Sequence, residues 1–228
     1  MTAWNKRDDI ITRFKVRLHR ELMDNIQAGK RRGDTMGVTV ALGDSLTYGY
    51  PYSPGSSWVS LAAKKLGITI YNRGINGDTS LDMLARLEPD VLSLHPDIVI
   101  ILAGSNDALG YKGVIGWRET KKALLELKSL IEAAGGKVIF VLPPPVDEPL
   151  AEARLQVQRK WLQEEAAGRD YDPLDFYIPL LAENKIGIRP EFTVDGLHPN
   201  KSGYKVLAQA AVTGLKRLEP VMRAHKQK

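Results

Sequence analysis

The chain has 228 residues, of which 43% are hydrophobic and 26% charged, and a formal net charge of +5. This composition is typical of a globular chain long enough for one sizeable core, and it excludes a disordered protein. The chain has no cysteine, which excludes disulfides, cysteine-ligated metal sites and a thiol nucleophile. Its apolar runs fall short of the roughly 20 residues that cross a bilayer, and no secretory signal is visible. We therefore expect a cytoplasmic protein without stable membrane insertion.

Residues 1–36 form a basic N-terminal extension, with nine basic and five acidic side chains. Apolar residues recur there at helical spacing and predict an amphipathic helix over residues 8–28, followed by a linker. Basic and acidic side chains alternate without interleaved aromatic residues, so we expect a solvated helix face and no nucleic-acid partner. The apolar stripe is expected to pack on the main domain, residues 37–228. Docking on a membrane surface or a neighbouring subunit stays open, as does the oligomeric state.

Strands and helices are predicted to alternate along the rest of the chain. The predicted strands cover residues 38–42, 68–71, 98–102, 137–142 and 175–178. The predicted helices cover residues 57–66, 79–87, 116–134, 148–167 and 202–218. Asp78 or Thr79 is the expected N-cap of the second helix, and the charged tail after Pro220 is expected to fray. The alternation predicts one α/β domain, with a mainly parallel sheet and helices on both faces.

The first predicted strand stops at Gly43, and Asp44 and Ser45 follow directly. Ser45 either caps the next helix or is a nucleophile at the sheet edge where ligands bind. Loops after parallel strands converge at that edge. Four such loops carry polar groups: residues 44–45, 76–78, 105–107 and 195–198. Their convergence favours the nucleophile.

A serine nucleophile needs a base, usually a histidine that a third group orients. The chain has four histidines, and only His198 lies in a loop on the expected side of the sheet. Asp195 stands shortly before it, so the carboxylate can turn back onto the imidazole Nδ1 and leave Nε2 for the serine proton. We therefore predict a catalytic triad of Ser45, Asp195 and His198.

Acyl transfer also needs hydrogen-bond donors for the developing oxyanion. The candidates are the backbone N–H groups of Ser45 and Gly77 and the side-chain amide of Asn106. Taken singly, Gly77 is as readily a turn glycine, and Asn106 is as readily a loop cap. Together with Ser45 and His198 they complete an acyl-transfer set, so we predict an oxyanion hole.

Four motifs resemble those of the GDSL/SGNH hydrolase family. They are Gly43-Asp44-Ser45-Leu46, Gly77 within residues 76–80, Gly104-Ser105-Asn106-Asp107 and residues 195–200, in the family's order between about residues 38 and 218. The resemblance implies a flavodoxin-like three-layer α/β/α fold around a five-stranded sheet, and ester hydrolysis without a cofactor. It implies Ser45, Gly77, Asn106 and His198 as the functional residues, with Asp195 as the triad acid. The G-x-S-x-G motif of the other large serine-hydrolase fold is absent.

Two other functions compete with this interpretation. Asp44, Asp78, Asp107 and Asp195 lie near strand ends, where oxygen-rich clusters suit Mg²⁺ and a metal-dependent phosphohydrolase. However, the chain lacks a G-x-x-x-x-G-K-[ST] phosphate loop, and Asp44 and Asp107 are more simply acceptors that tie loops. We therefore expect no metal. The second alternative is a non-catalytic binding member of the same fold, against which the intact Ser–Asp–His set counts.

The expected partner is a small-molecule ester, but its identity is the least defined part of the prediction. Asp44, Tyr48, Tyr50, Pro144 and Val146 are expected to line the site, although aromatic side chains are core-forming by default. Candidate substrates are short-chain acyl esters, lysophospholipids, thioesters and acetylated sugars. The sequence decides neither the acyl-chain preference nor whether water or another alcohol accepts the acyl group.

Overall fold

The structure, a computed structural model, describes residues 37–167 and 172–225. The N-terminal extension, residues 1–36, with its predicted helix, lies outside the described residues and stays a prediction.

Five strands form one sheet in the order β2-β1-β3-β4-β5, and every neighbouring pair is parallel. The strands are β1 (Thr39–Gly43), β2 (Ile70–Gly74), β3 (Ile98–Leu102), β4 (Lys137–Leu142) and β5 (Leu174–Asp175). The direction of winding reverses between β1 and β3. Open α/β sheets bind ligands at such a switch point, beyond the carboxyl ends of the strands. The predicted parallel sheet is confirmed, and its topology points to the ends of β1 and β3.

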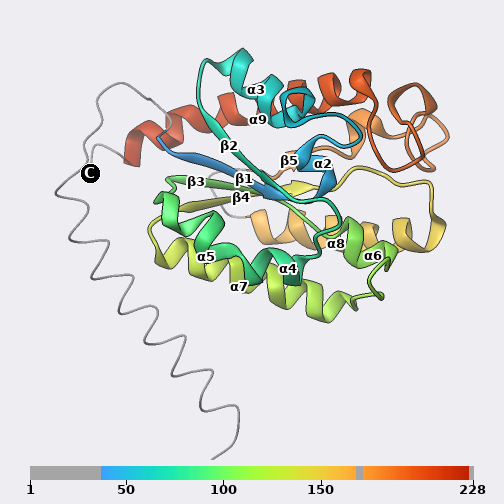
Figure 1. Cartoon of the computed structure of the whole chain (residues 1–228), viewed down its shortest axis with the longest axis horizontal. Coiled ribbons are helices and arrows are strands. Elements are labelled where there is room, and N and C mark those ends of the chain that lie inside the picture. The colour runs from blue at the N-terminus through green and yellow to red at the C-terminus, as the bar shows by residue number, and fades with distance from the viewer. Residues whose placement is uncertain (1–36, 168–171, 226–228) are drawn as a thin grey trace, which may run out of the picture.

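Helices cover both faces of the sheet, which gives the predicted three layers (Figure 1). One face carries α3 (Trp58–Leu66) and α9 (Lys201–His225), and the other carries α4 (Ser80–Ala85), α5 (Leu87–Asp90), α7 (Trp117–Ala133) and α8 (Pro149–Ala166). The short elements are α2 (Ser45–Tyr48), α6 (Ser105–Leu109), η1 (Pro54–Ser56), η2 (Leu92–Leu94), η3 (Ile178–Leu180) and η4 (Pro190–Phe192). In β1, Ala41 packs into the core beside α3 and α9, whereas Val40 and Leu42 pack into the core on the other face. Burial on both faces explains why the central strands are continuous apolar runs.

The edge strand β2 lies later in the chain than predicted. It runs from Ile70 to Gly74 rather than over residues 68–71. Its middle residues, Asn72 and Arg73, are polar, and both donate side-chain hydrogen bonds to backbone carbonyl groups of other segments. Because these side chains are satisfied by tertiary contacts, the strand has no apolar signature in the sequence.

The other edge strand, β5, is shorter than predicted, and the range 175–178 is wrong. The Asp175 carboxylate accepts hydrogen bonds from the N–H groups of Tyr177 (2.8 Å) and Ile178 (3.0 Å). This local side-chain acceptor turns the chain away from the sheet and into η3.

The helix predicted over residues 79–87 breaks at Arg86 into α4 and α5. Pro89 explains the break, because it has no N–H to donate to the carbonyl of Ala85. The N-cap is Thr79, which forms a capping box with Asp82.

The other long helices follow the prediction closely, with two differences. The last helix, α9, continues to His225, beyond the predicted end at residue 218. No residue range is predicted for α2 or α6, the short helices that begin directly after β1 and β3, although a helix start at Ser45 is one of the two expectations for that residue. Both carry residues of the candidate site.

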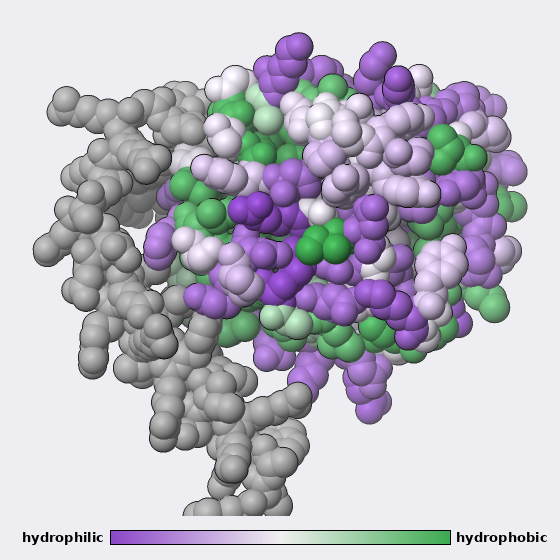
Figure 2. Space-filling view, in the orientation of Figure 1, coloured by the Kyte–Doolittle hydropathy of each residue, from purple (hydrophilic) through white to green (hydrophobic). Residues whose placement is uncertain are grey.

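On the face shown in Figure 2, hydrophobic residues are scattered in small patches among hydrophilic ones. Most large apolar side chains instead pack into the two cores that flank the sheet. Within residues 37–167 and 172–225, no helix is long and apolar enough to cross a membrane.

Candidate active site

Ser45 is the first residue of α2, directly beyond the end of β1. The N-cap is Asp44, whose Oδ1 accepts a hydrogen bond from the N–H of Leu46 at 2.9 Å. Capping is therefore not the role of Ser45, and its Oγ lies 3.1 Å from Nε2 of His198. Gly43 makes this tight turn possible, because a Cβ there would lie 2.2 Å from Oγ1 of Thr47. The strand–turn–helix junction thus directs Ser45 toward the histidine.

Asp195 holds both the ring and the backbone of His198. Its Oδ2 lies 2.7 Å from Nδ1 of the imidazole, and its Oδ1 accepts from the N–H groups of Leu197 (3.0 Å) and His198 (2.7 Å). Burial would raise the pKa of Asp195, but the hydrogen bonds from His198 and Leu197 outweigh it and lower the pKa below its ordinary value. The ionised carboxylate fixes the ring so that Nε2 faces Ser45. The three predicted triad residues are thus brought together.

The predicted oxyanion donors lie on adjoining loops. Asn106, in the first turn of α6, donates from Nδ2 to the carbonyl of Asp78 at 2.9 Å. Gly77 immediately precedes Asp78 and has a φ of +80°, a conformation that favours glycine. The N–H of Ile75, in the same turn, donates to the carbonyl of Gly43 at 3.1 Å. These bonds join the loops of Gly77 and Asn106 to the turn that carries Ser45.

The acidic residues near the strand ends act as hydrogen-bond acceptors. Asp44 is 1% exposed, and burial, with smaller contributions from Asp107 and Asp78, raises its pKa to about 7. Asp107 accepts from the backbone and side chain of Ser80 and from Oγ1 of Thr120, the last at 3.1 Å. Within the part of the chain that the structure describes, no three His, Cys, Asp or Glu residues form a group that could hold a metal ion.

Of the predicted lining residues, Tyr50 is the one that contacts the triad. Its ring meets that of His198 edge to face, with the centroids 4.6 Å apart, and its side chain is 42% exposed. The hydroxyl of Tyr204, from α9, donates to the carbonyl of Tyr50 at 2.7 Å and holds this wall of the site. Tyr48 is partly buried on α2.

Pro144 and Val146 are both buried, and their described contacts are with other parts of the protein. Val146 is 2% exposed and belongs to a small apolar cluster with Leu197, the residue before His198. Pro144 is also buried, and its carbonyl accepts a hydrogen bond from Nη2 of Arg159 at 2.7 Å. Asp44, being buried, likewise supports the site from within.

Two residues that the sequence does not mark hold these loops. Asp147 donates its N–H to the carbonyl of Gly196 (2.9 Å), and its Oδ1 accepts from the N–H of Ile188 (2.9 Å). Arg86 contacts the ends of β1 and β2. Both residues bond backbone groups of other segments, and such partners leave no side-chain pattern in the sequence.

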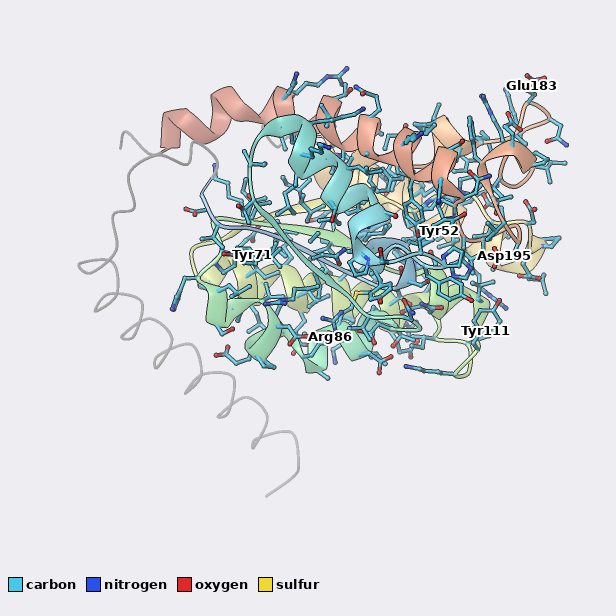
Figure 3. All side chains as sticks on the ribbon, turned by 45° about the horizontal axis from the view of Figure 1, so that its top comes forward. Tyr52, Tyr71, Arg86, Tyr111, Glu183 and Asp195 are labelled. Carbon is cyan, nitrogen blue, oxygen red and sulfur yellow. The ribbon has the colours of Figure 1, made fainter. Side chains whose placement is uncertain are left out.

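A parallel sheet of this order, with a Ser–His–Asp chain at its carboxyl edge, defines the class of serine hydrolases. Residues 41–206 match the GDSL-like Lipase/Acylhydrolase family, and the chain belongs to this family. Figure 3 shows Asp195, Tyr52 and Tyr111 at the same end of the molecule, the end that carries the site.

Relatives and solved structures agree with this assignment. The chain is 30% identical over 181 residues to an arylesterase of Vibrio mimicus, which covers 75% of this chain and 84% of the relative. It is also 30% identical over 190 residues to thioesterase 1/protease 1/lysophospholipase L1 of Escherichia coli strain K12, covering 79% and 83%. The lipase/acylhydrolase of Enterococcus faecalis has a similar structure, with a TM-score of 0.67, 28% identity, and coverage of 82% of this chain and 97% of that one.

Proposed function

We propose that this protein is a serine esterase that hydrolyses carboxylic esters through an acyl-enzyme on Ser45. The observation that carries the proposal is the continuous hydrogen-bonded chain from Asp195 to His198 (2.7 Å) to Ser45 (3.1 Å). A serine hydroxyl is a weak nucleophile until an adjacent base takes its proton. His198 is within reach of that proton, and Asp195 holds it in the tautomer that can accept it.

In acylation, Oγ of Ser45 attacks the carbonyl carbon of the ester while its proton passes to Nε2 of His198. The imidazolium that forms is stabilised by the Asp195 carboxylate. His198 then donates the proton to the leaving alkoxide, and the carbon–oxygen bond to the alcohol breaks. In deacylation, His198 takes a proton from water as its oxygen attacks the acyl-enzyme carbonyl. His198 then returns the proton to Oγ of Ser45 as the bond from Oγ to the acyl carbon breaks, and the carboxylic acid is released.

The tetrahedral intermediate carries a negative oxygen that needs fixed donors. We assign these to the N–H groups of Ser45 and Gly77 and to Nδ2 of Asn106. A side-chain amide has two N–H donors, and one of them is used by the carbonyl of Asp78 at 2.9 Å. The second contact of Nδ2, to Oδ2 of Asp44, is long at 3.4 Å. This second donor is therefore the less committed one and suits the oxyanion.

We propose short-chain acyl and aryl esters as the substrate class. The exposed ring of Tyr50 beside His198 offers an apolar wall to a small acyl or aryl group. Tyr111 is 75% exposed. Its neighbour Lys112 comes near the Gly77 turn, because Cε of Lys112 lies 4.0 Å from the position that a Cβ on Gly77 would take. Relatives are named arylesterase, thioesterase 1/protease 1/lysophospholipase L1 and acetylxylan esterase. The substrates that these names indicate all contain an acyl carbonyl, and they differ in the group that leaves it. A cytoplasmic location stays a prediction.

The test compares Ser45→Ala with Ser105→Ala on p-nitrophenyl acetate and butyrate. Ser105 is a matched control, because it is buried and is the first residue of α6, as Ser45 is of α2. We expect Ser45→Ala to lower kcat by at least about 10⁴-fold, with circular dichroism and Tm unchanged, and Ser105→Ala to keep nearly full activity. Turnover retained by Ser45→Ala would reject the proposal. A panel that adds acyl-thioesters, lysophospholipids and acetylated sugars on the wild type then ranks the substrates.

A further inference from the structure

Arg86 stands at the break between α4 and α5, as the C-cap of one and the N-cap of the other. Its side chain is 14% exposed, although it carries a full positive charge. Buried cations need partners, so the contacts of this guanidinium indicate what it is for. In Figure 3, Arg86 lies on the side of the sheet that carries α4 and α5.

The guanidinium contacts the ends of two neighbouring strands. Nη2 donates to the carbonyl of Gly43, the last residue of β1, at 3.0 Å and to the carbonyl of Arg73, in β2, at 2.9 Å. Nε donates to Oδ2 of Asp78 at 2.6 Å, and Nη1 donates to Oδ2 of Asp90 at 2.8 Å. A planar fork of five N–H donors can hold several acceptors in fixed directions, which a lysine ammonium cannot do.

Three of these acceptors adjoin the proposed oxyanion donors. The carbonyl of Gly43 lies directly before the Asp44–Ser45 turn. Arg73 and Asp78 flank the segment that carries Gly77, so Arg86 holds that segment at both ends. The backbone carbonyl of Asp78 in turn accepts from Nδ2 of Asn106. The segments that carry the three donors are therefore all held, directly or through Asp78, by the side chain of Arg86.

We propose that Arg86 is the positioning residue of the oxyanion hole, fixing the Gly77 segment and the Asn106 amide relative to Ser45. The inference rests on the proposed esterase function. Arg86 contacts no reacting atom and acts through Gly43, Arg73 and Asp78. Transition-state stabilisation needs donors that are in place before charge develops, so displacement of this frame lowers kcat more than it changes KM.

The kinetic test uses Arg86→Gln and Arg86→Lys in the full chain with p-nitrophenyl butyrate. Lys128→Gln is the matched control: Lys128 is 16% exposed and pairs with Glu165 at 2.8 Å between α7 and α8, away from the strand ends of the site. We expect kcat to fall about 100-fold in Arg86→Gln, with KM within about threefold, because misplaced donors resemble lost ones. Arg86→Lys keeps the charge and is expected to fold and to lose roughly tenfold. Lys128→Gln is expected to stay near wild type. Equal kcat in the Arg86 and Lys128 variants would overturn the proposal, as would a loss carried by KM alone.

A second readout needs no substrate and separates this inference from the esterase proposal. NMR shifts of the Ser45 and Gly77 amides and of the Asn106 side-chain amide report on the frame itself. We expect these signals to move in Arg86→Lys and Arg86→Gln and to stay in place in Lys128→Gln. Unmoved signals would overturn the role of Arg86 whatever the wild-type activity is, whereas failure of the esterase proposal appears in Ser45→Ala instead.

Discussion

The two halves of the site differ in how deeply their side chains are buried. Ser45 and Asn106, on the nucleophile side, are each 7% exposed. The side chains of His198 and Asp195, on the base side, are 15% and 47% exposed. The nucleophile side is built from strand ends and helix starts, whereas the base side is an irregular loop between η4 and α9.

The bonds that hold the two halves differ in the same way. On the nucleophile side they join distant segments, such as the carbonyl of Asp78 and the amide of Asn106. In the base loop they are mostly local, with Asp195 bonded to residues two and three positions later, and Asp147 as a tie to another segment. The comparison indicates that the proposed oxyanion donors are the preorganised part, while the position of His198 depends mostly on contacts within its own loop.

Among the variants that test this comparison, Asn106→Ala is expected to have the largest effect. The variant removes a donor from the nucleophile side, so kcat should fall roughly 10²–10³-fold with KM little changed. Steady-state kinetics on p-nitrophenyl butyrate measures this. Asn76→Ala, an exposed position in the turn that carries Gly77, is the control and should be close to wild type. An Asn106→Ala enzyme with normal kcat would remove Asn106 from the oxyanion hole.

A smaller effect is expected from Asp147→Ala, which keeps the backbone bond to Gly196 but removes the carboxylate that packs against Gly196 in the base loop. The variant loses the acceptor for the N–H of Ile188, a bond of 2.9 Å. One hydrogen bond is worth about 1 kcal/mol, so we expect kcat to fall about fivefold. Amide hydrogen exchange should speed up over residues 187–197 and stay unchanged around Ser45.

Asp147→Asn is the control for that prediction, because its amide oxygen still accepts a hydrogen bond. It should keep most of the activity and protection. If Asp147→Ala changed exchange around Ser45 as much as around residues 187–197, the two halves would not be separately held.

The sequence predicted the buried parts of this molecule better than the parts that arrange the site. The strands at residues 98–102 and 137–142 match β3 and β4, because strands buried on both faces are continuous apolar runs. The proposed triad and donor residues were identifiable because side-chain chemistry and strand-end position coincide in them. Arg86 and Asp147 were not identifiable, since their partners include backbone groups brought near only by folding.

A different kind of effect, on stability and its pH dependence, is expected from Asp44→Asn. Burial raises the pKa of Asp44 from 3.8 to about 7, so the folded protein holds a proton that the unfolded chain releases between these pH values. The wild type therefore loses unfolding free energy as pH rises through this window, and the neutral asparagine does not. Between pH 5 and pH 8, the free energy of unfolding measured with urea should fall by roughly 1–3 kcal/mol more in the wild type than in Asp44→Asn. Parallel pH dependence of the two proteins would contradict a buried, protonated Asp44.

The central claim is that Ser45 is the nucleophile, and covalent labelling tests it most directly. The full chain is incubated with a p-nitrophenyl alkylphosphonate, and the adduct is located by intact mass and peptide mapping. We predict one adduct, on Ser45, that is absent in Ser45→Ala, retained in Ser105→Ala and formed far more slowly in His198→Ala. An adduct on another residue, or none on a protein that still hydrolyses esters, would contradict the account.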